Sequence, residues 1–355
     1  MVMWGAVILL ALAGTTVNMD LLTFLMECFV HCGPSRIVSG WEAQEGQFPH
    51  QLSLRMVSPA GGVSSCGGTI IHAAWGLTAA HCTASRVSLV IRAGTVNLTQ
   101  PSAIFETTKY YNHPLYNEIL QSVVQPNDIG LIEFGRELVF TTIQPIRIQR
   151  SEARDKVYAG TQSIASGWGR TWTNGVSPEN LNWVFLSITT NFECLFAYGG
   201  SSIIQPSTIC AYGYNVTSQS TCQGDSGGPL TIIDIDGAVT QVGVTSFVSA
   251  TGCHTNFPAG FIRPGFYHHW FTQVTGIDFD WQYVPSTESP ESTTNSTPEV
   301  ETTKPVPETT SAPEVGTTEP ELVTTGAPEE LTSPSAPESS EESDDSSSSS
   351  SSESS

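Results

Sequence analysis

The chain has 355 residues, a formal net charge of −21 and eight cysteines, and it has no basic block that would suggest nucleic-acid binding. The charge is uneven, because residues 285–355 carry 16 acids and one Lys whereas the preceding residues carry 18 acids and 12 bases. The acidity therefore belongs mainly to the end of the chain. The length of the chain alone permits one large domain or two smaller ones.

Residues 1–14 form a short apolar run that ends in small residues. Such a run is too short to span a bilayer and is typical of a secretory signal peptide. A buried hydrophobic segment is the alternative, because the run lacks the usual Lys or Arg near its start. Secretion also accounts for the cysteines. No later stretch is long and apolar enough to cross a membrane, so we expect a secreted, extracellular protein without a membrane anchor.

The central part of the chain, residues 37–284, has the composition of a globular domain. Short β-rich runs punctuated by Gly recur in it and predict an all-β barrel or sandwich. The expected strands cover residues 67–71, 87–93, 129–134, 163–166, 229–233 and 242–248. An aromatic-rich stretch over residues 265–274 predicts a closing helix, and Pro264 suits its first turn.

The composition changes abruptly after residue 285, where Ser, Thr, Pro and Glu dominate. So few apolar residues cannot offset chain entropy, and the segment is expected to be a disordered tail. Its composition favours an O-glycosylated, mucin-like stalk over an unmodified acidic linker. It has no hydrophobic terminus, so a GPI anchor is not expected. Sequons for N-glycosylation occur at Asn97, Asn215 and Asn295.

The run from Cys222 to Leu230 places Ser226 between an acid and two glycines. Glycines let the backbone turn tightly and approach a ligand closely. Such a turn can aim a hydroxyl and backbone N–H groups at one point, as acyl transfer requires. Taken alone, however, the run also fits an ordinary Gly/Ser turn.

Three further runs change the interpretation of that turn. His81 ends an apolar run beside a cysteine, and Asp128 precedes an apolar strand. Arg36 precedes the β-branched pair Ile37-Val38. A lone His is more often structural and a lone Asp can merely cap a strand, so the order of the runs carries the argument.

In that order, these runs resemble the chymotrypsin-like serine proteases over residues 37 to about 275. The run Ser-Phe-Val-Ser-Ala-Thr-Gly-Cys, residues 246–253, is similar to invertebrate digestive chymotrypsins of the brachyurin type. The resemblance implies two six-stranded antiparallel β-barrels with a C-terminal helix and an active site in the cleft between the barrels.

The resemblance also implies a role for each residue of the motifs. Ser226 would be the nucleophile, His81 the general base and Asp128 its orienting partner. Histidine suits this role because its pKa of about 6.5 lets it accept and return a proton. The backbone N–H groups of Gly224 and Ser226 would form the oxyanion hole, and Ser246 would support the aspartate.

The segment over residues 15–36 is expected to be an activation propeptide. The resemblance implies that a trypsin-like enzyme cleaves after Arg36 and that the new ammonium group of Ile37 pairs with Asp225. The protein would therefore be a zymogen. Ser39 departs from the commoner Ile-Val-Gly-Gly start, and we expect this change to be tolerated.

The family pattern implies three disulfides, Cys66–Cys82, Cys194–Cys210 and Cys222–Cys253. Cys28 and Cys32 remain, and a local bridge between them would leave the propeptide free to depart. A metal site with His31 is the alternative, which a single Cys-x3-Cys supports poorly. No metal and no cofactor are expected.

The expected specificity pocket is uncharged. The resemblance places Ser220 at its base, with Phe247 and Val248 along its wall and Ala259 as a third small residue. An uncharged base favours apolar side chains, and Val248 should narrow the mouth, as in elastases. The preference is thus chymotrypsin-like or elastase-like. The expected partners are protein or peptide substrates, a trypsin-like activator and macromolecular protease inhibitors, with no nucleic acid.

Two other functions compete with an active endopeptidase. The first is a non-catalytic binding protein on the same fold, but such proteins usually lose a triad residue and this chain retains all three. The second is a mucin-like surface or matrix component whose tail carries the function. A tail of this kind can coexist with catalysis.

Overall fold

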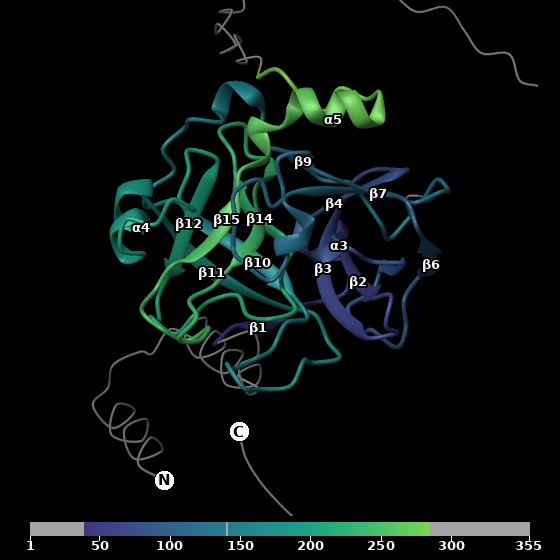
Figure 1. Cartoon of the computed structure of the whole chain (residues 1–355), viewed down its shortest axis with the longest axis horizontal. Coiled ribbons are helices and arrows are strands. Elements are labelled where there is room, and N and C mark those ends of the chain that lie inside the picture. The colour runs from purple at the N-terminus through teal and green to yellow at the C-terminus, as the bar shows by residue number, and fades with distance from the viewer. Residues whose placement is uncertain (1–38, 140, 284–355) are drawn as a thin grey trace, which may run out of the picture. The chain divides into compact units, whose positions relative to one another are not determined.

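A computed structural model describes residues 39–139 and 141–283 (Figure 1). The predicted signal peptide, propeptide and tail lie outside these residues, as do Arg36, Ile37 and Asn295. The described part is mostly β-sheet, which confirms the expected all-β class. No helix in this part is long and apolar enough to cross a bilayer.

The first sheet forms a half-barrel from the N-terminal half of the domain. Its strands are antiparallel in the order β6-β5-β2-β3-β4-β8-β7. The two end strands are consecutive in sequence, separated by Thr108 and Lys109. Leu89, Ile91 and Ala93 point inward from β5 and are fully buried, as strand alternation requires. The strands are β2 (Gln51–Val57), β3 (Val63–His72), β4 (Trp75–Thr78), β5 (Ser88–Ala93), β6 (Ala103–Thr107), β7 (Tyr110–Asn112) and β8 (Gly130–Glu133).

The second sheet closes into a barrel. Its path β11-β10-β13-β14-β15-β12 returns on itself because β12 also pairs with β11, from Leu186↔Gly213 to Thr189↔Cys210. Two short strands extend this sheet, with β1 on β11 and β9 parallel to β14. The strands are β1 (Trp41–Glu42), β9 (Arg147–Ile148), β10 (Gln162–Gly167), β11 (Asn182–Thr189), β12 (Thr208–Gly213), β13 (Pro229–Ile233), β14 (Val239–Phe247) and β15 (Ala259–Ile262).

The helices of the described part are short. The α-helices are α3 (Ala80–Thr83), α4 (Asn191–Ala197) and α5 (His268–Thr275), and the 3-10 turns are η1 (Glu118–Leu120), η2 (Ser151–Ala153) and η3 (Pro264–Phe266). A capping box between Thr190 and Glu193 starts α4. The closing helix expected over residues 265–274 is confirmed as α5, which begins three residues later than expected, at His268. Tyr267 leaves helical geometry at ψ 8°, so a 3-10 turn that starts at Pro264 comes first and α5 follows.

Helix α5 packs beside the first barrel although the chain reaches it from the second (Figure 1). Its Trp270 and Phe271 belong to the core cluster of the first barrel, which also includes Val244 and Ile262 from the second. This shared core holds the two barrels together. A separate cluster, with Val184, Leu186 and Phe261 among its members, fills the second barrel.

After α5 the chain contacts both residues of β9. Trp281 donates from Nε1 to the carbonyl oxygen of Ile148 at 2.9 Å, and the Arg147 guanidinium lies 3.9 Å from the centre of a Trp281 ring. Asp280 accepts a hydrogen bond of 2.9 Å from the backbone N–H of Ser151. These contacts bind Asp280 and Trp281 to the body of the domain.

Candidate active site

His81 is positioned by a short strand and a single helical turn. Strand β4 is buried throughout and ends at Thr78, and α3 begins two residues later. The backbone N–H of His81 donates to Asp128 Oδ1 at 2.8 Å. Its neighbour Cys82 is bonded to Cys66 on β3. The backbone on both sides of the imidazole is therefore restrained.

Asp128 is buried just before β8. Asn127 has a φ of 60°, a left-handed conformation that Asn tolerates, and accepts a hydrogen bond of 3.1 Å from the Tyr267 hydroxyl. The second carboxylate oxygen, Oδ2, lies 2.7 Å from His81 Nδ1 and accepts a 2.6 Å bond from the Ser246 hydroxyl. The carboxylate thus receives three hydrogen bonds and fixes the orientation of the ring.

The charge of Asp128 also sets the ionisation of His81. Burial alone would lower the pKa of His81, but the charge and hydrogen bond of Asp128 outweigh burial and raise this pKa above its ordinary value of 6.5. Arg86 opposes this rise weakly. The imidazole is therefore a stronger base than free histidine, because Asp128 stabilises the imidazolium.

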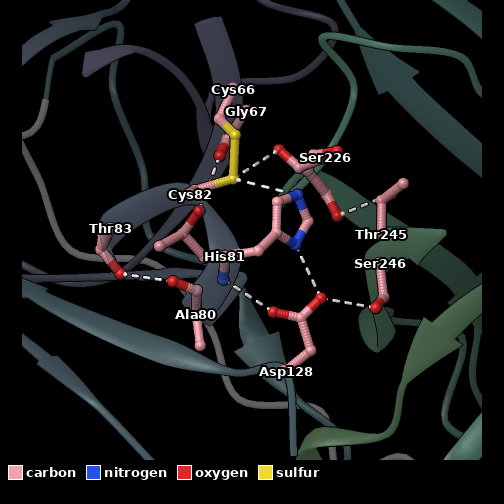
Figure 2. Close-up of a disulfide and its surroundings, with 12 residues drawn as sticks. Cys66, Gly67, Ala80, His81, Cys82, Thr83, Asp128, Ser226, Thr245 and Ser246 are labelled. Atoms are coloured by element: carbon pink, nitrogen blue, oxygen red, sulfur yellow. Dashed lines mark hydrogen bonds and ion pairs between the residues drawn. A yellow bond between two sulfur atoms is a disulfide. The ribbon is translucent and has the colours of Figure 1, made fainter. Parts of the chain in front are cut away.

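Ser226 lies on the opposite side of the imidazole from Asp128 (Figure 2). Cys82 Sγ is 3.8 Å from His81 Nε2 and 3.6 Å from the carbonyl oxygen of Ser226, so the disulfide borders both groups. Gly224 and Gly227 flank the serine with φ values of 103° and 79°. A Cβ on Gly227 would lie 2.1 Å from Thr78 Oγ1, so glycine is required there.

Two backbone N–H groups of this loop are free to donate. The N–H groups of Asp225 and Gly227 bond to the carbonyl oxygens of Cys222 and Thr245. Among the residues that the structure describes, no acceptor is bonded to the N–H groups of Gly224 and Ser226. These are the two groups to which the family resemblance assigns the oxyanion hole.

The three candidate catalytic residues line one cavity of about 330 Å³. Ser246, Phe247 and Val248 of the predicted pocket line it as well. Ser220 and Ala259 do not line this cavity, and they are only 5% and 1% exposed. Val248 packs against the Cys222–Cys253 disulfide, which is formed as the resemblance implied. The same holds for Cys66–Cys82 and Cys194–Cys210.

Sequence reasoning missed one wall of the cavity. This wall comes from the segment before Asp128 and consists of Tyr116, Gln121, Ser122, Val123 and Val124. Val123 and Val124 are 54% and 42% exposed. A pair of valines in a loop rich in Gln, Ser and Asn was the available signal. Gln223, also missed, lines the cavity beside the serine.

Asp225 points away from the cavity into a buried site. It accepts hydrogen bonds of 2.8 Å from the N–H of Cys222 and 2.7 Å from that of Gly169. Burial outweighs these bonds and raises the pKa of Asp225 to about 6. No cation pairs with this carboxylate among the residues of the described ranges.

Ser39, the first described residue, lies near the Cys222 loop. Its hydroxyl is 3.0 Å from that of Ser218, and its carbonyl oxygen accepts a 3.1 Å bond from Gln219. Its φ is 60°, a conformation that favours glycine. The serine that departs from the family pattern thus adopts a left-handed backbone and gains a hydroxyl contact there.

One group of potential metal ligands occurs in the described part, formed by Cys66, His81 and Cys82. Both cysteines belong to a disulfide and offer no thiolate, so this group does not fit a metal ion. Cys28, His31 and Cys32 lie outside the described residues.

Two of the three predicted glycosylation sites can be located. Asn215 is exposed. The side-chain amide nitrogen of Asn97, the atom that would carry a glycan, donates a hydrogen bond to Asn180 Oδ1 at 2.8 Å.

Comparisons with known proteins agree with this geometry. The trypsin family profile, described as "Trypsin", matches residues 37–271. The chain is 34% identical over 244 residues to a collagenase of Hypoderma lineatum, covering 69% of this chain and 89% of that protein. It is 32% identical over 245 residues to chymotrypsin-like elastase family member 1 of Rattus norvegicus, covering 68% and 90%.

A solved structure of HL collagenase superposes with a TM-score of 0.61 at 33% identity, covering 68% of this chain and 99% of that one. Fold, cavity and relatives together define a chymotrypsin-like serine endopeptidase. The chain belongs to the trypsin family.

Proposed function

We propose that this protein is a secreted endopeptidase, made as a zymogen, that hydrolyses peptide bonds after apolar residues. The observation that carries the reaction is the 2.7 Å pair between His81 Nδ1 and Asp128 in a cavity that Ser226 shares. Trypsin-family relatives with a collagenase or elastase name support a protein or peptide substrate.

Ser226 Oγ attacks the scissile carbonyl while His81 Nε2 takes its proton. Asp128 holds the ring and stabilises the imidazolium. The N–H groups of Gly224 and Ser226 donate to the oxyanion, and the loss of one such donor typically costs about 2.7–4 kcal/mol of transition-state stabilisation. His81 then protonates the leaving amine, and a water molecule, activated in the same way, releases the acyl group.

Activation by cleavage after Arg36 is supported by the state of Asp225. Asp225 is a buried carboxylate with two N–H donors and no cation among the described residues, and a new ammonium group on Ile37 would supply one. Ser39 lies two residues after Ile37, and Ser218 and Gln219 hold it beside the Cys222 loop. The activator would be a trypsin-like enzyme, since the bond follows an arginine.

Preference for apolar residues is supported by the walls of the pocket. Phe247 and Val248 line the cavity with apolar surface, and Ser220 and Ala259, which are buried outside its lining, add no charge. A medium-sized or large apolar side chain before the scissile bond fits these walls. We further propose the boundaries 1–14, 15–36, 37–284 and 285–355 for signal, propeptide, protease and stalk, with Asn215 as the better placed glycan site because it is exposed.

The decisive experiment labels the activated protein with a serine-directed phosphonate. We expect full labelling after cleavage at Arg36, none with Ser226→Ala, and cleavage of apolar substrates only by the labelled form. Ser122→Ala is the matched control, because Ser122 lines the same cavity without a role in the chemistry. Absence of both labelling and hydrolysis would favour a non-catalytic binding protein, and strict cleavage after Arg or Lys would contradict the proposed pocket.

A further inference from the structure

The described part of the chain holds eleven Lys and Arg side chains, and eight of them have a partner inside the protein. The partners are carboxylates, carbonyl oxygens or aromatic rings. The eight are Arg86, Lys109, Arg136, Arg147, Arg150, Arg154, Lys156 and Arg263. Arg55, Arg92 and Arg170 have no ion pair, side-chain hydrogen bond or ring contact with any described residue. Three cations are therefore available to a ligand.

Two of these arginines line a cavity that also reaches the candidate oxyanion hole. Arg55 and Arg92 border about 320 Å³ together with Gly224 and Trp168. Arg92 Nε is buried and has no hydrogen-bond partner among the residues that the structure describes. Arg170 follows Trp168 by two residues in the chain but does not line this cavity.

Acidic side chains near this cavity do not neutralise the arginines. Glu179 lines the cavity, and Glu106 lies on the strand next to β5. Neither forms an ion pair in the described ranges. An unpaired guanidinium in a partly enclosed site attracts a carboxylate, which it can bind with two parallel hydrogen bonds.

The sheet register places Arg92 relative to Ser226. Arg92 pairs with Ser53 on β2, and Ser53 pairs with Gly67 on β3. The N–H of Gly67 donates to the carbonyl oxygen of Ser226 at 2.7 Å. Because strands lie about 4.8 Å apart, Arg92 is roughly 10 Å from Gly67. An extended peptide covers about that distance in three residues.

We propose that Arg55 and Arg92 form a carboxylate-binding subsite for the part of the substrate that follows the scissile bond. The substrate class is a peptide with an apolar residue before the scissile bond and Asp or Glu as the second or third residue after it. This inference rests on the proposed endopeptidase function. Arg92 is the central contact because its Nε is buried and unpaired, and Arg55 contributes from the neighbouring strand.

The test uses the full chain cut after Arg36 and quenched fluorescent peptides with Leu before the scissile bond. Peptides in each pair differ only by Glu or Gln at one of the four positions after that bond. We expect kcat/KM to be roughly fivefold to tenfold higher for Glu at the second or third position. Sodium chloride at about 0.5 M should remove most of this ratio, because it screens the charges.

Arg92→Gln and Arg55→Gln should lower the Glu/Gln ratio to within about twofold of one, with unchanged kcat/KM for the Gln peptides. Arg136→Gln is the matched control, because Arg136 contacts Phe105 elsewhere on the same barrel.

A Glu/Gln ratio near one in the unaltered enzyme, with the Gln peptides cleaved normally, would overturn the subsite alone. A Glu/Gln ratio of kcat/KM that is near one at low salt and rises as salt is added would also overturn the subsite. It would indicate that the acidic tail occupies the two arginines until salt displaces it. Failure to cleave any peptide would overturn the proposed function itself.

Discussion

The backbone N–H of Gly67 donates to the carbonyl oxygen of Ser226 at 2.7 Å and joins the first barrel to the candidate nucleophile loop. Cys66, the neighbour of Gly67, is bonded to Cys82, the neighbour of His81. A short covalent path thus connects the candidate base to the strand that contacts the candidate nucleophile. The relative position of the two groups depends on how closely β3 approaches the loop.

Gly67→Ala should separate the barrels slightly at this point. The new Cβ would lie 3.0 Å from Gly228 Cα and 3.1 Å from its nitrogen, which are backbone atoms that cannot rotate away. We expect kcat/KM to fall, but by less than the roughly hundredfold that a 1 Å misplacement can cost, because these contacts require a shift of only a few tenths of an ångström. Gly62→Ala is the control, because its Cβ would meet only the Ser58 hydroxyl, which can rotate. Equal activity of the two variants would contradict the expectation.

The pH dependence of activity should follow His81. Because the pKa of His81 lies above 6.5, kcat/KM should fall as the pH decreases through a midpoint above 6.5, where the base becomes protonated. Asp128→Asn removes the interaction that raises this pKa, so the midpoint should move to lower pH while kcat falls by about 10⁴. Ser246→Ala leaves two of the three hydrogen bonds to Asp128 and should have a much smaller effect. A wild-type midpoint below 6.5 would contradict this assignment.

The uncut protein should lose stability as Asp225 ionises. The pKa of Asp225 is about 6 in the folded protein and 3.8 as a reference, so the folded state binds more protons between those values. The contribution of Asp225 to the free energy of unfolding should therefore be largest below about pH 4 and fall by about 3 kcal/mol as the pH rises through 6. Urea unfolding of uncut Ser226→Ala protein measures this.

Asp225→Asn in the same background is the comparison, and it should lack this component of the pH dependence. After cleavage at Arg36 the sign should reverse, because the ammonium group of Ile37 favours the ionised carboxylate. Identical pH profiles with Asp and Asn would show that Asp225 is not the titrating group.

Val248→Gly should widen the specificity pocket. Val248 lines the cavity and packs on the Cys222–Cys253 disulfide, so the loss of its side chain opens room beside Ser226. We expect the preference before the scissile bond to shift toward Phe and Tyr by about tenfold or more, since each methylene in such a pocket is worth about 1–3 kcal/mol. Profiling with a peptide library measures the shift. Val157→Gly, at a site 73% exposed and outside the cavity, should leave the profile unchanged.

Much of the fold could be predicted because the strand signal is local. The run expected over residues 229–233 is the whole of β13, and the run over residues 163–166 lies within β10. Strand β2 was missed even though its interior positions Leu52, Leu54 and Met56 alternate strictly. The break before α5 was missed because it depends on the backbone of Tyr267, which no composition pattern reveals.

The candidate site also has a part that the sequence could predict and a part that it could not. His81, Asp128 and Ser226 lie in recognisable runs, and the structure brings them to one cavity. Arg55 and Arg92 are 37 positions apart, and their significance is the lack of a partner. Whether a cation is paired depends on contacts between strands distant in sequence, so the sequence alone could not distinguish these two arginines from the eight with partners.

The contact between Arg147 and Trp281 determines where this protein can be shortened. The family match stops at residue 271, but Trp281 covers the Arg147 guanidinium and Asp280 accepts from Ser151. A protein trimmed at residue 271 would lack Asp280 and Trp281, which would leave the Arg147 guanidinium without its ring and the Ser151 N–H without its acceptor. A catalytic fragment should therefore extend at least through Trp281, and the chain should be replaced or exchanged only beyond that residue.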